Sequence, residues 1–204
     1  MAQSQVETMT KLVVRLQSSE FPETSFASQP KTMYRAGTGY CRIEEFPDLE
    51  NGIHGLVIMN EPDTWMVNRL NKSAKHFVDE GPTFNCRMPV FVDQVRSVED
   101  TKTKLMQLEF GRELAYFKRN GATESEGPVL QGKPTKAYSL EVEDCTLFLI
   151  TTGTPERPVA IARDRAEPKN RETYWYGAFE QVPFDIKLFE KPQGVTIEDV
   201  KPEK

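Results

Sequence analysis

HGLVIMNEPDTWMVNRLNKSAKHFVD, residues 54–79, contains three apolar runs separated by two short polar segments. Pro62 and Asp63 in the first segment, and Asn71 and Ser73 in the second, favour tight reversals of the chain. Apolar runs of this length between turn residues are typical of consecutive β-hairpins. We therefore predict a β-meander here, and the rest of the fold is built around it.

The pairing of these three strands decides which side chains share a face. We expect each turn to close on its flanking residues, Asn60 with Thr64 and Leu70 with Ala74. Because side chains alternate across a sheet, one face then collects a set of apolar residues. These are Val57, Met59, Trp65, Val67 and Phe77. The opposite face is also apolar near its middle, whereas a sheet with one wet side alternates more cleanly. We therefore expect both faces to be covered, one by a helix and the other by a loop, a neighbouring subunit or an apolar ligand.

Further strand patterns flank the meander, at residues 8–17, 32–35, 40–46, 136–142, 145–151, 158–163 and 173–182. Between the two groups the spacing of apolar residues changes to that of a helix, with one stripe formed by Met106, Phe110, Leu114 and Phe117. We predict a mainly β protein of the α+β kind. Its expected form is an open, curved antiparallel half-barrel of about eight to ten strands that wraps a central helix near residues 97–120. Because no long linker divides the chain, residues 1–204 are expected to form one domain.

The composition excludes several functional classes. The net charge is −5 with mixed signs and no basic stripe, which excludes nucleic acid as an expected partner. No run of about 18 apolar residues predicts a transmembrane helix. The segment AQSQVET after Met1 is polar and rich in small residues, as expected after a signal peptide is removed before Ala2, although an ordinary ragged N-terminus reads the same way.

Residues for metal binding or catalysis are few. His54 and His76 have no acid at ligand spacing, and Cys41, Cys86 and Cys145 form no CxxC pair, so we predict neither a metal site nor a cofactor. No GxSxG motif supports a serine nucleophile, and we expect no enzymatic activity. Two cysteines pair if the protein is exported, or all three are buried thiols; the sequence leaves both open.

The segment YGAFEQVPFDIKLFEKPQGVTIEDV, residues 176–200, resembles the end of the outer-membrane lipoprotein carrier (LolA-like) superfamily. In that superfamily a final strand with an aromatic residue leads into a Pro-Phe-Asp…Leu-Phe turn and a Pro-x-Gly-Val segment. The matching residues here are Tyr176, Pro183, Phe184, Asp185, Leu188, Phe189, Pro192, Gly194 and Val195. YRAGTGYCRIEE, residues 34–45, is similar to the early strand pair. The carriers usually begin with an amphipathic helix, whereas residues 8–17 here read as a strand.

The resemblance implies a half-barrel whose concave face holds a lipid or an acylated chain. The predicted ligand-binding residues are then Val57, Met59, Trp65, Val67, Phe77, Met106, Phe110, Leu114 and Phe117. The alternative is that they form an ordinary core beneath the helix. Glu113 lies close to the helical stripe and needs a partner, because an unpaired buried charge is costly. Pairing with Arg42 or Arg69 would latch the helix as a lid, and the alternative is a solvated acid or a static salt bridge.

These patterns and the resemblance together predict a function. We expect an exported, periplasmic protein that binds lipid or lipoprotein acyl chains without catalysis, as a carrier or an envelope sensor, with other envelope proteins as further partners. A second hypothesis is a structural or interaction module with a filled core, whose sheet a protein partner covers. A third, an enzyme, would need an acid/base pair inside the cavity.

Overall fold

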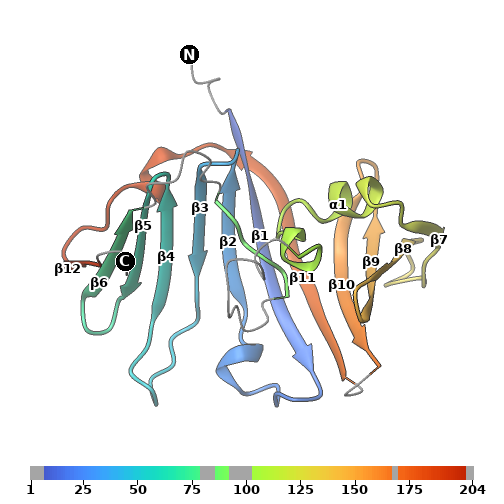
Figure 1. Ribbon diagram of the computed structural model, residues 1–204, viewed down its shortest axis with the longest axis horizontal. Helices are drawn as coiled ribbons and strands as arrows, with labels where there is room; N and C mark the ends of the chain where they lie inside the picture. Colours follow the sequence, from blue (N-terminus) through green and yellow to red (C-terminus); the bar gives the residue numbers. More distant parts are fainter. Residues whose placement is uncertain (1–6, 79–85, 92–102, 167–169, 201–204) are drawn as a thin grey trace. The chain divides into compact units, whose positions relative to one another are not determined.

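Twelve β-strands form one sheet in the computed structural model, which describes residues 7–78, 86–91, 103–166 and 170–200 (Figure 1). The strands are β1 (Thr8–Ser18), β2 (Lys31–Ala36), β3 (Tyr40–Glu44), β4 (Gly55–Asn60), β5 (Asp63–Asn68), β6 (Ser73–Val78), β7 (Thr123–Glu126), β8 (Lys136–Val142), β9 (Cys145–Thr152), β10 (Arg157–Arg165), β11 (Asn170–Pro183) and β12 (Thr196–Asp199). Their order is β12-β6-β5-β4-β3-β2-β1-β11-β10-β9-β8-β7. The two ends of this order are different strands, so the sheet is open. The predicted class, mainly β with an open antiparallel sheet and a helix, is confirmed.

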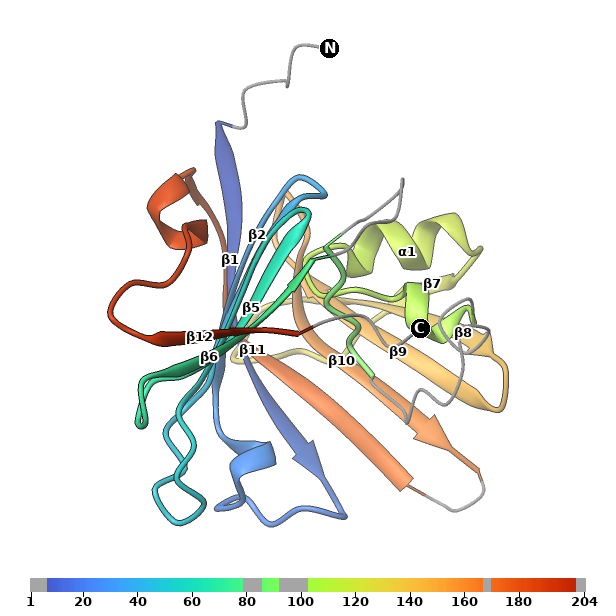
Figure 2. The same ribbon diagram turned by 60° about the vertical axis from the view of Figure 1, so that its left-hand side comes forward.

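All ten predicted strands are present, and two further strands were not predicted as such. β7 has the sequence Thr-Glu-Ser-Glu with every residue exposed, so it carries no apolar alternation. β12 lies in the C-terminal segment, where no strand was predicted from the sequence. It pairs with β6 in parallel, with Ile197 opposite Ala74, and is thus an exception to the predicted antiparallel order (Figure 2).

The predicted helix at residues 97–120 is too long. Residues 97–102 lie outside the described part of the chain, and helix α1 spans only Glu113–Arg119. Between them lies one short 3-10 turn, η3 (Leu105–Gln107). Gly111 then adopts a φ of +84°, a left-handed conformation that glycine tolerates and that a helix cannot contain.

Residues within the predicted helix pair with an extended segment instead. The Val90 N–H donates to the Leu108 carbonyl at 3.0 Å, and the Phe110 N–H donates to the Met88 carbonyl at 2.8 Å. These bonds satisfy backbone groups that a helix would otherwise use internally. Helical spacing of apolar side chains was therefore misleading before Gly111 and correct after it.

The chain divides into two compact units that share strands β1 and β11. The first contains Met1–Val13, Gln29–Arg87 and Glu180–Lys204, and the second contains Val14–Ser28 and Met88–Phe179. The single domain expected over residues 1–204 stays a prediction.

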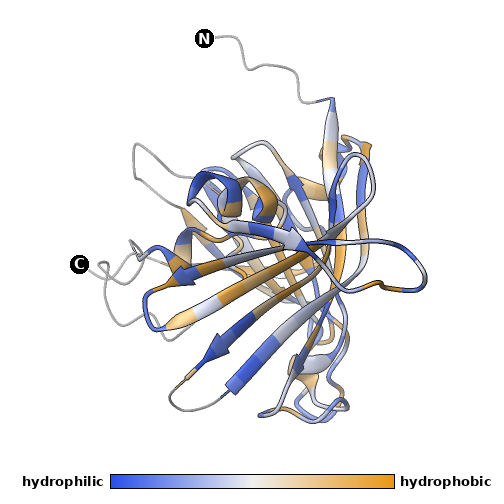
Figure 3. Cartoon of the chain, turned by 90° about the vertical axis from the view of Figure 1, so that its right-hand side faces the viewer, coloured by the Kyte–Doolittle hydropathy of each residue, from blue (hydrophilic) through white to orange (hydrophobic). Residues whose placement is uncertain are grey.

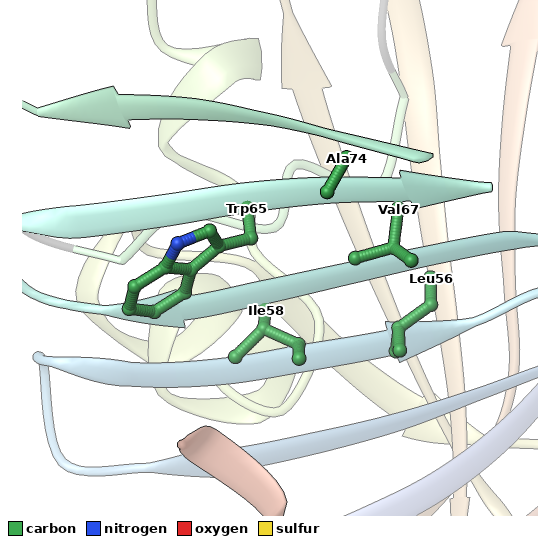
Figure 4. Packing of buried hydrophobic residues seen from close by; sticks show 5 residues of the cluster. All are labelled: Leu56, Ile58, Trp65, Val67 and Ala74. Carbon is green, nitrogen blue, oxygen red and sulfur yellow. The ribbon is translucent and has the colours of Figure 1, made fainter. Parts of the chain in front are cut away.

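In the first unit, the predicted register of the meander is wrong. Asn60 lies opposite Asp63 and Asn68 lies opposite Ser73, so the first turn has two residues and the second has four. A shift of one position moves every side chain of a strand to the other face. The face that carries Trp65 and Val67 therefore carries Leu56, Ile58 and Ala74 as well, and these five form one buried cluster (Figure 4).

The C-terminal segment of the chain covers this buried face. Val195 and Ile197 pack against the cluster, and the 3-10 turn η4 (Ile186–Phe189) packs against β3 and β4. Phe189 is fully buried in a neighbouring cluster with Met9 and Ala36. The expectation that the meander face is covered holds here, but the cover is the C-terminal segment rather than the central helix.

A histidine joins β12 to the meander. The two ring nitrogens of His76 lie 2.7 Å from Asp199 Oδ1 and 2.7 Å from Asp63 Oδ1, and the ring stacks on Trp65 with centroids 5.3 Å apart. The hydrogen bond to Asp199 is the largest cause that raises the pKa of His76, with Asp63 adding to it against the effect of burial. The side chains of Asp63, His76 and Asp199 thus connect β5, β6 and β12, and we call these three residues the clasp.

The cysteines take the paired alternative. Cys41 and Cys86 form a disulfide with Cα atoms 6.0 Å apart, and Cys145 is a buried free thiol. Burial raises the pKa of Cys145 to about 11, so this thiol is not an activated nucleophile. Among the described residues, no group of three or more potential metal ligands is found, and no helix is long and apolar enough to cross a membrane.

Candidate ligand-binding groove

In the second unit, both faces of the sheet are apolar. β9 alternates between fully buried Leu147 and Leu149 on one face and half-buried Phe148 and Ile150 on the other. Helix α1 packs against β8, β9 and β10. Figure 3, viewed from the side of this unit, shows hydrophobic residues along the middle of its strands. The second face, which carries Phe148 and Ile150, is therefore apolar although it is only half-buried.

Strand register brings small residues between large ones on that second face. Phe148 lies opposite Ala162, and Ile150 lies opposite Ala160. On the other side of β10, Ala160 lies opposite Trp175. Because alanine ends at Cβ, β10 forms a low floor between the taller side chains of β9 and β11.

This floor belongs to a groove with a volume of about 650 Å³. That volume lies within the range of about 300–1,000 Å³ typical of small-molecule sites. The groove is lined by Gln17, Ser18, Ser19, Pro128, Phe148, Ile150, Ala160, Ala162, Arg171, Thr173 and Trp175. Every lining residue belongs to the second unit, so the groove is complete within it.

Trp175 forms the most prominent wall of the groove. Its side chain is 41% exposed, which is unusual for so large an apolar group. The indole Nε1–H donates to Gln17 Oε1 at 2.8 Å, which holds the ring in place without blocking its face. A fixed, exposed aromatic surface next to an alanine floor suits contact with an apolar chain.

One end of the groove is polar. The guanidinium of Arg171 lies 5.8 Å from the centroid of the Phe148 ring, and its Nε lies 3.4 Å from Asp164 Oδ1. Arg171 is the charged residue among those that line the groove. The lining therefore offers apolar contact and one cation, and no pair of groups suited to acid/base chemistry.

The predicted ligand residues of the meander are divided between two faces. Trp65 and Val67 lie under the C-terminal segment, with 5% of each exposed. Val57, Met59 and Phe77 are half-buried on the opposite face, where Met59 Sδ lies 3.6 Å from Cys86 Sγ. Ligand contact at these three residues stays a prediction.

The predicted ligand residues of the helical stripe belong to the interior of the second unit. Phe110 packs edge-on against Tyr174, with centroids 5.1 Å apart, and Phe117 is fully buried. Met106 and Leu114 are half-buried. None of the four lines the groove, and the core alternative describes Phe110 and Phe117 better.

The predicted latch residues have other partners. Glu113 is 1% exposed, and its Oε1 accepts hydrogen bonds from the Tyr176 hydroxyl and the Gly111 N–H, both at 2.7 Å. Burial, followed by the negative charge of Glu113, raises the pKa of Tyr176 well above its usual value. Arg42 and Arg69 lie 2.6 Å and 3.4 Å from Glu44 Oε1. Glu113 therefore anchors α1 to β11 through the Tyr176 hydroxyl, and the two arginines bind Glu44.

Sequence reasoning missed the groove although the signal was present. Residues 145–151 read CTLFLIT, in which Phe148 and Ile150 alternate with Leu147 and Leu149. This is the same pattern, apolar on both faces, from which we inferred a covered meander. The decisive feature is the pair of alanines on the neighbouring strand, and their position opposite Phe148 and Ile150 requires knowledge of the register.

Neither a family model nor a curated protein sequence matches this chain. Among solved structures, an uncharacterized conserved protein from Thermus thermophilus is 8% identical, with 96% of this chain and 92% of that chain covered and a TM-score of 0.54. At this identity the likeness shows the fold alone. A MucA/MucB complex from Pseudomonas aeruginosa is 11% identical, with 95% and 59% covered and a TM-score of 0.46. A LolA superfamily protein from Nitrosomonas europaea is 8% identical, with 92% and 91% covered and a TM-score of 0.37.

Proposed function

We propose that this protein is an exported, non-catalytic binding protein that holds an apolar or amphipathic ligand in the groove of its second unit. The single observation that carries this proposal is the alanine floor of β10 between Phe148 and the exposed ring of Trp175. A lipid or the acyl chain of a lipoprotein is the ligand whose shape fits such an apolar groove.

The hydrophobic effect supplies the binding energy. Burial of apolar surface contributes about 25 cal/mol per Å², or about 0.8 kcal/mol for each fully buried methylene. Burial of about ten methylenes therefore gives about 8 kcal/mol, the free energy of reversible binding in the micromolar range. Reversible binding suits a carrier or an envelope sensor, which must release what it binds.

Export is supported by the Cys41–Cys86 disulfide. Disulfides form and persist in oxidising compartments such as the bacterial periplasm and are rare in the cytosol. We therefore propose a periplasmic location.

A second candidate function, that of an interaction module, rests on the same exposed ring of Trp175. Trp175 would then be covered by an envelope protein partner instead of a lipid, because exposed apolar patches also mark protein contacts. The two functions differ in whether the isolated protein binds an acyl chain.

The test is binding of an apolar fluorescent dye to the purified protein, followed by displacement with a fatty acid. We expect displacement by the wild type and loss of dye binding in Ala162→Phe, whose new ring fills the groove. Ala115→Phe adds the same ring at an exposed position of α1 and serves as the matched control. Absence of dye binding by the wild type, together with native mass spectra of protein free of lipid, would contradict the proposal and favour the interaction module.

A further inference from the structure

The apolar groove continues into a polar pocket at the end of β10 and the start of β11. This second pocket has a volume of about 630 Å³ and shares Ser19 and Arg171 with the groove. Its other lining residues are Thr146, Asp164, Arg165, Ala166 and Asn170. The two spaces are therefore neighbours with different chemistry, one apolar and one carrying two arginines.

From this arrangement we propose that the ligand is an anionic, single-chain amphiphile whose carboxylate or phosphate lies at Arg165 and Arg171. This inference rests on the proposed function, because it assigns the chain of the same ligand to the groove. The direction of the bound ligand follows from one face of β11. There Trp175, Thr173 and Arg171 occupy alternate positions, from the apolar groove to the polar pocket. At a rise of about 3.4 Å per residue, the indole and the guanidinium are attached about 14 Å apart along the strand.

Charge favours an anion at the polar end. The lining contains two cations, Arg165 and Arg171, and one anion, Asp164, which leaves a net charge of +1. Asp164 is 3.4 Å from Arg171 Nε, so it offsets part of the attraction without cancelling it. Arginine binds carboxylates and phosphates through a planar fork of donors, which makes it the side chain best suited to such headgroups.

Side-chain hydrogen bonds hold the residue that precedes Arg171 in place. Its neighbour Asn170 is 8% exposed, accepts a hydrogen bond from Ser19 Oγ and donates one to Glu20 Oε1, both at 2.8 Å. These bonds tie the start of β11 to the end of β1. These hydrogen bonds fix Asn170, next to Arg171, before a ligand binds, which lowers the entropic cost of binding.

The width of the groove limits the ligand to one chain. Its walls stand on β9 and β11, which are separated by β10 alone. Two strand spacings amount to about 10 Å between backbones, part of which the side chains of Phe148 and Trp175 occupy. A ligand with two parallel acyl chains would extend beyond this space.

The experiment compares three ligands that share one chain and differ in charge: decanoic acid, decanol and decylamine. Calorimetric titration at neutral pH is expected to rank the acid first and the amine last. Arg165→Gln is expected to weaken binding of the acid about tenfold, the loss of one charge-assisted hydrogen bond, and thereby bring the acid close to the alcohol. Arg157→Gln removes one positive charge from an exposed position outside both pockets and is the matched control.

The outcomes separate this inference from the proposed function. Equal binding of all three ligands, unaffected by Arg165→Gln, would overturn the headgroup assignment while the apolar groove stands. Absence of binding by any of them would overturn both. Inorganic phosphate provides a further arm: displacement of decanoic acid by phosphate at equal concentration would mean a site for free anions, and would overturn the assignment to an amphiphile.

Discussion

Replacing Trp175 by alanine removes the main wall of the groove, and its effect on ligand affinity can be estimated from exposure. The side chain is 41% exposed. An aromatic side chain buries about 150–250 Å² when covered, so about 60–100 Å² of Trp175 is available to a ligand. At about 25 cal/mol per Å², covering this surface contributes about 1.5–2.5 kcal/mol. We therefore expect Trp175→Ala to raise the Kd for decanoic acid by about 10- to 60-fold.

Titration calorimetry measures this change, and thermal unfolding of the same variant checks that it folds. Trp175→Phe is the matched control, because it keeps an aromatic wall while it loses the hydrogen bond to Gln17 and the area of the second ring. A Kd for Trp175→Ala within about threefold of wild type, less than about 1 kcal/mol, would refute the assignment of this surface to the ligand.

Fluorescence gives an independent form of the same prediction. The chain has two tryptophans, Trp65 and Trp175. In the Trp65→Phe variant only Trp175 emits, and we expect its emission to shift to shorter wavelength when decanoic acid covers the ring. In Trp175→Phe the remaining Trp65 is already buried, at 5% exposure, and its emission should not respond. A response from Trp65 alone would locate the ligand in the first unit instead.

Two further predictions concern stability. The raised pKa of His76 means that the clasp stabilises the folded state fully below the unfolded pKa near 6.5 and loses this contribution as pH rises through the folded pKa. Urea unfolding of the wild type should therefore show falling stability over that interval, and His76→Ala should flatten the curve; identical curves would show that the clasp contributes nothing. The Cys41–Cys86 disulfide closes a loop with a sequence separation of 45 residues, so its reduction should cost about 4 kcal/mol in unfolding free energy. A melting temperature that reductant leaves unchanged would contradict this estimate.

The strands were predictable because their signals are local. Turn residues and alternating apolar residues placed the three strands of the meander correctly. Their register was not predictable, since the choice between a turn of two residues at Glu61-Pro62 and one of three depends on packing as well as on turn composition. This difference of one residue in turn length decides whether Trp65 shares a face with Met59 or with Ile58.

The helix shows a different limit. Met106 and Phe110 have helical spacing, but the backbone of Phe110 bonds to Met88, which lies 22 positions earlier by residue number. A long-range pairing of this kind leaves no trace in a short window of sequence. After Gly111 the backbone bonds locally, with the Tyr116 N–H donating to the Arg112 carbonyl, and there the spacing of Leu114 and Phe117 predicted the helix correctly.

The open sheet leaves two outer strands, and their composition affects how the protein behaves at high concentration. β7 and β12 are each four residues long, and each carries two acidic side chains: Glu124 and Glu126 in one, Glu198 and Asp199 in the other. Unpaired strand edges invite a second molecule to add its own strand, and short, like-charged edges resist such addition by electrostatic repulsion. Because this barrier is electrostatic, salt screens it, so storage at high ionic strength is the condition under which fibrils should first form.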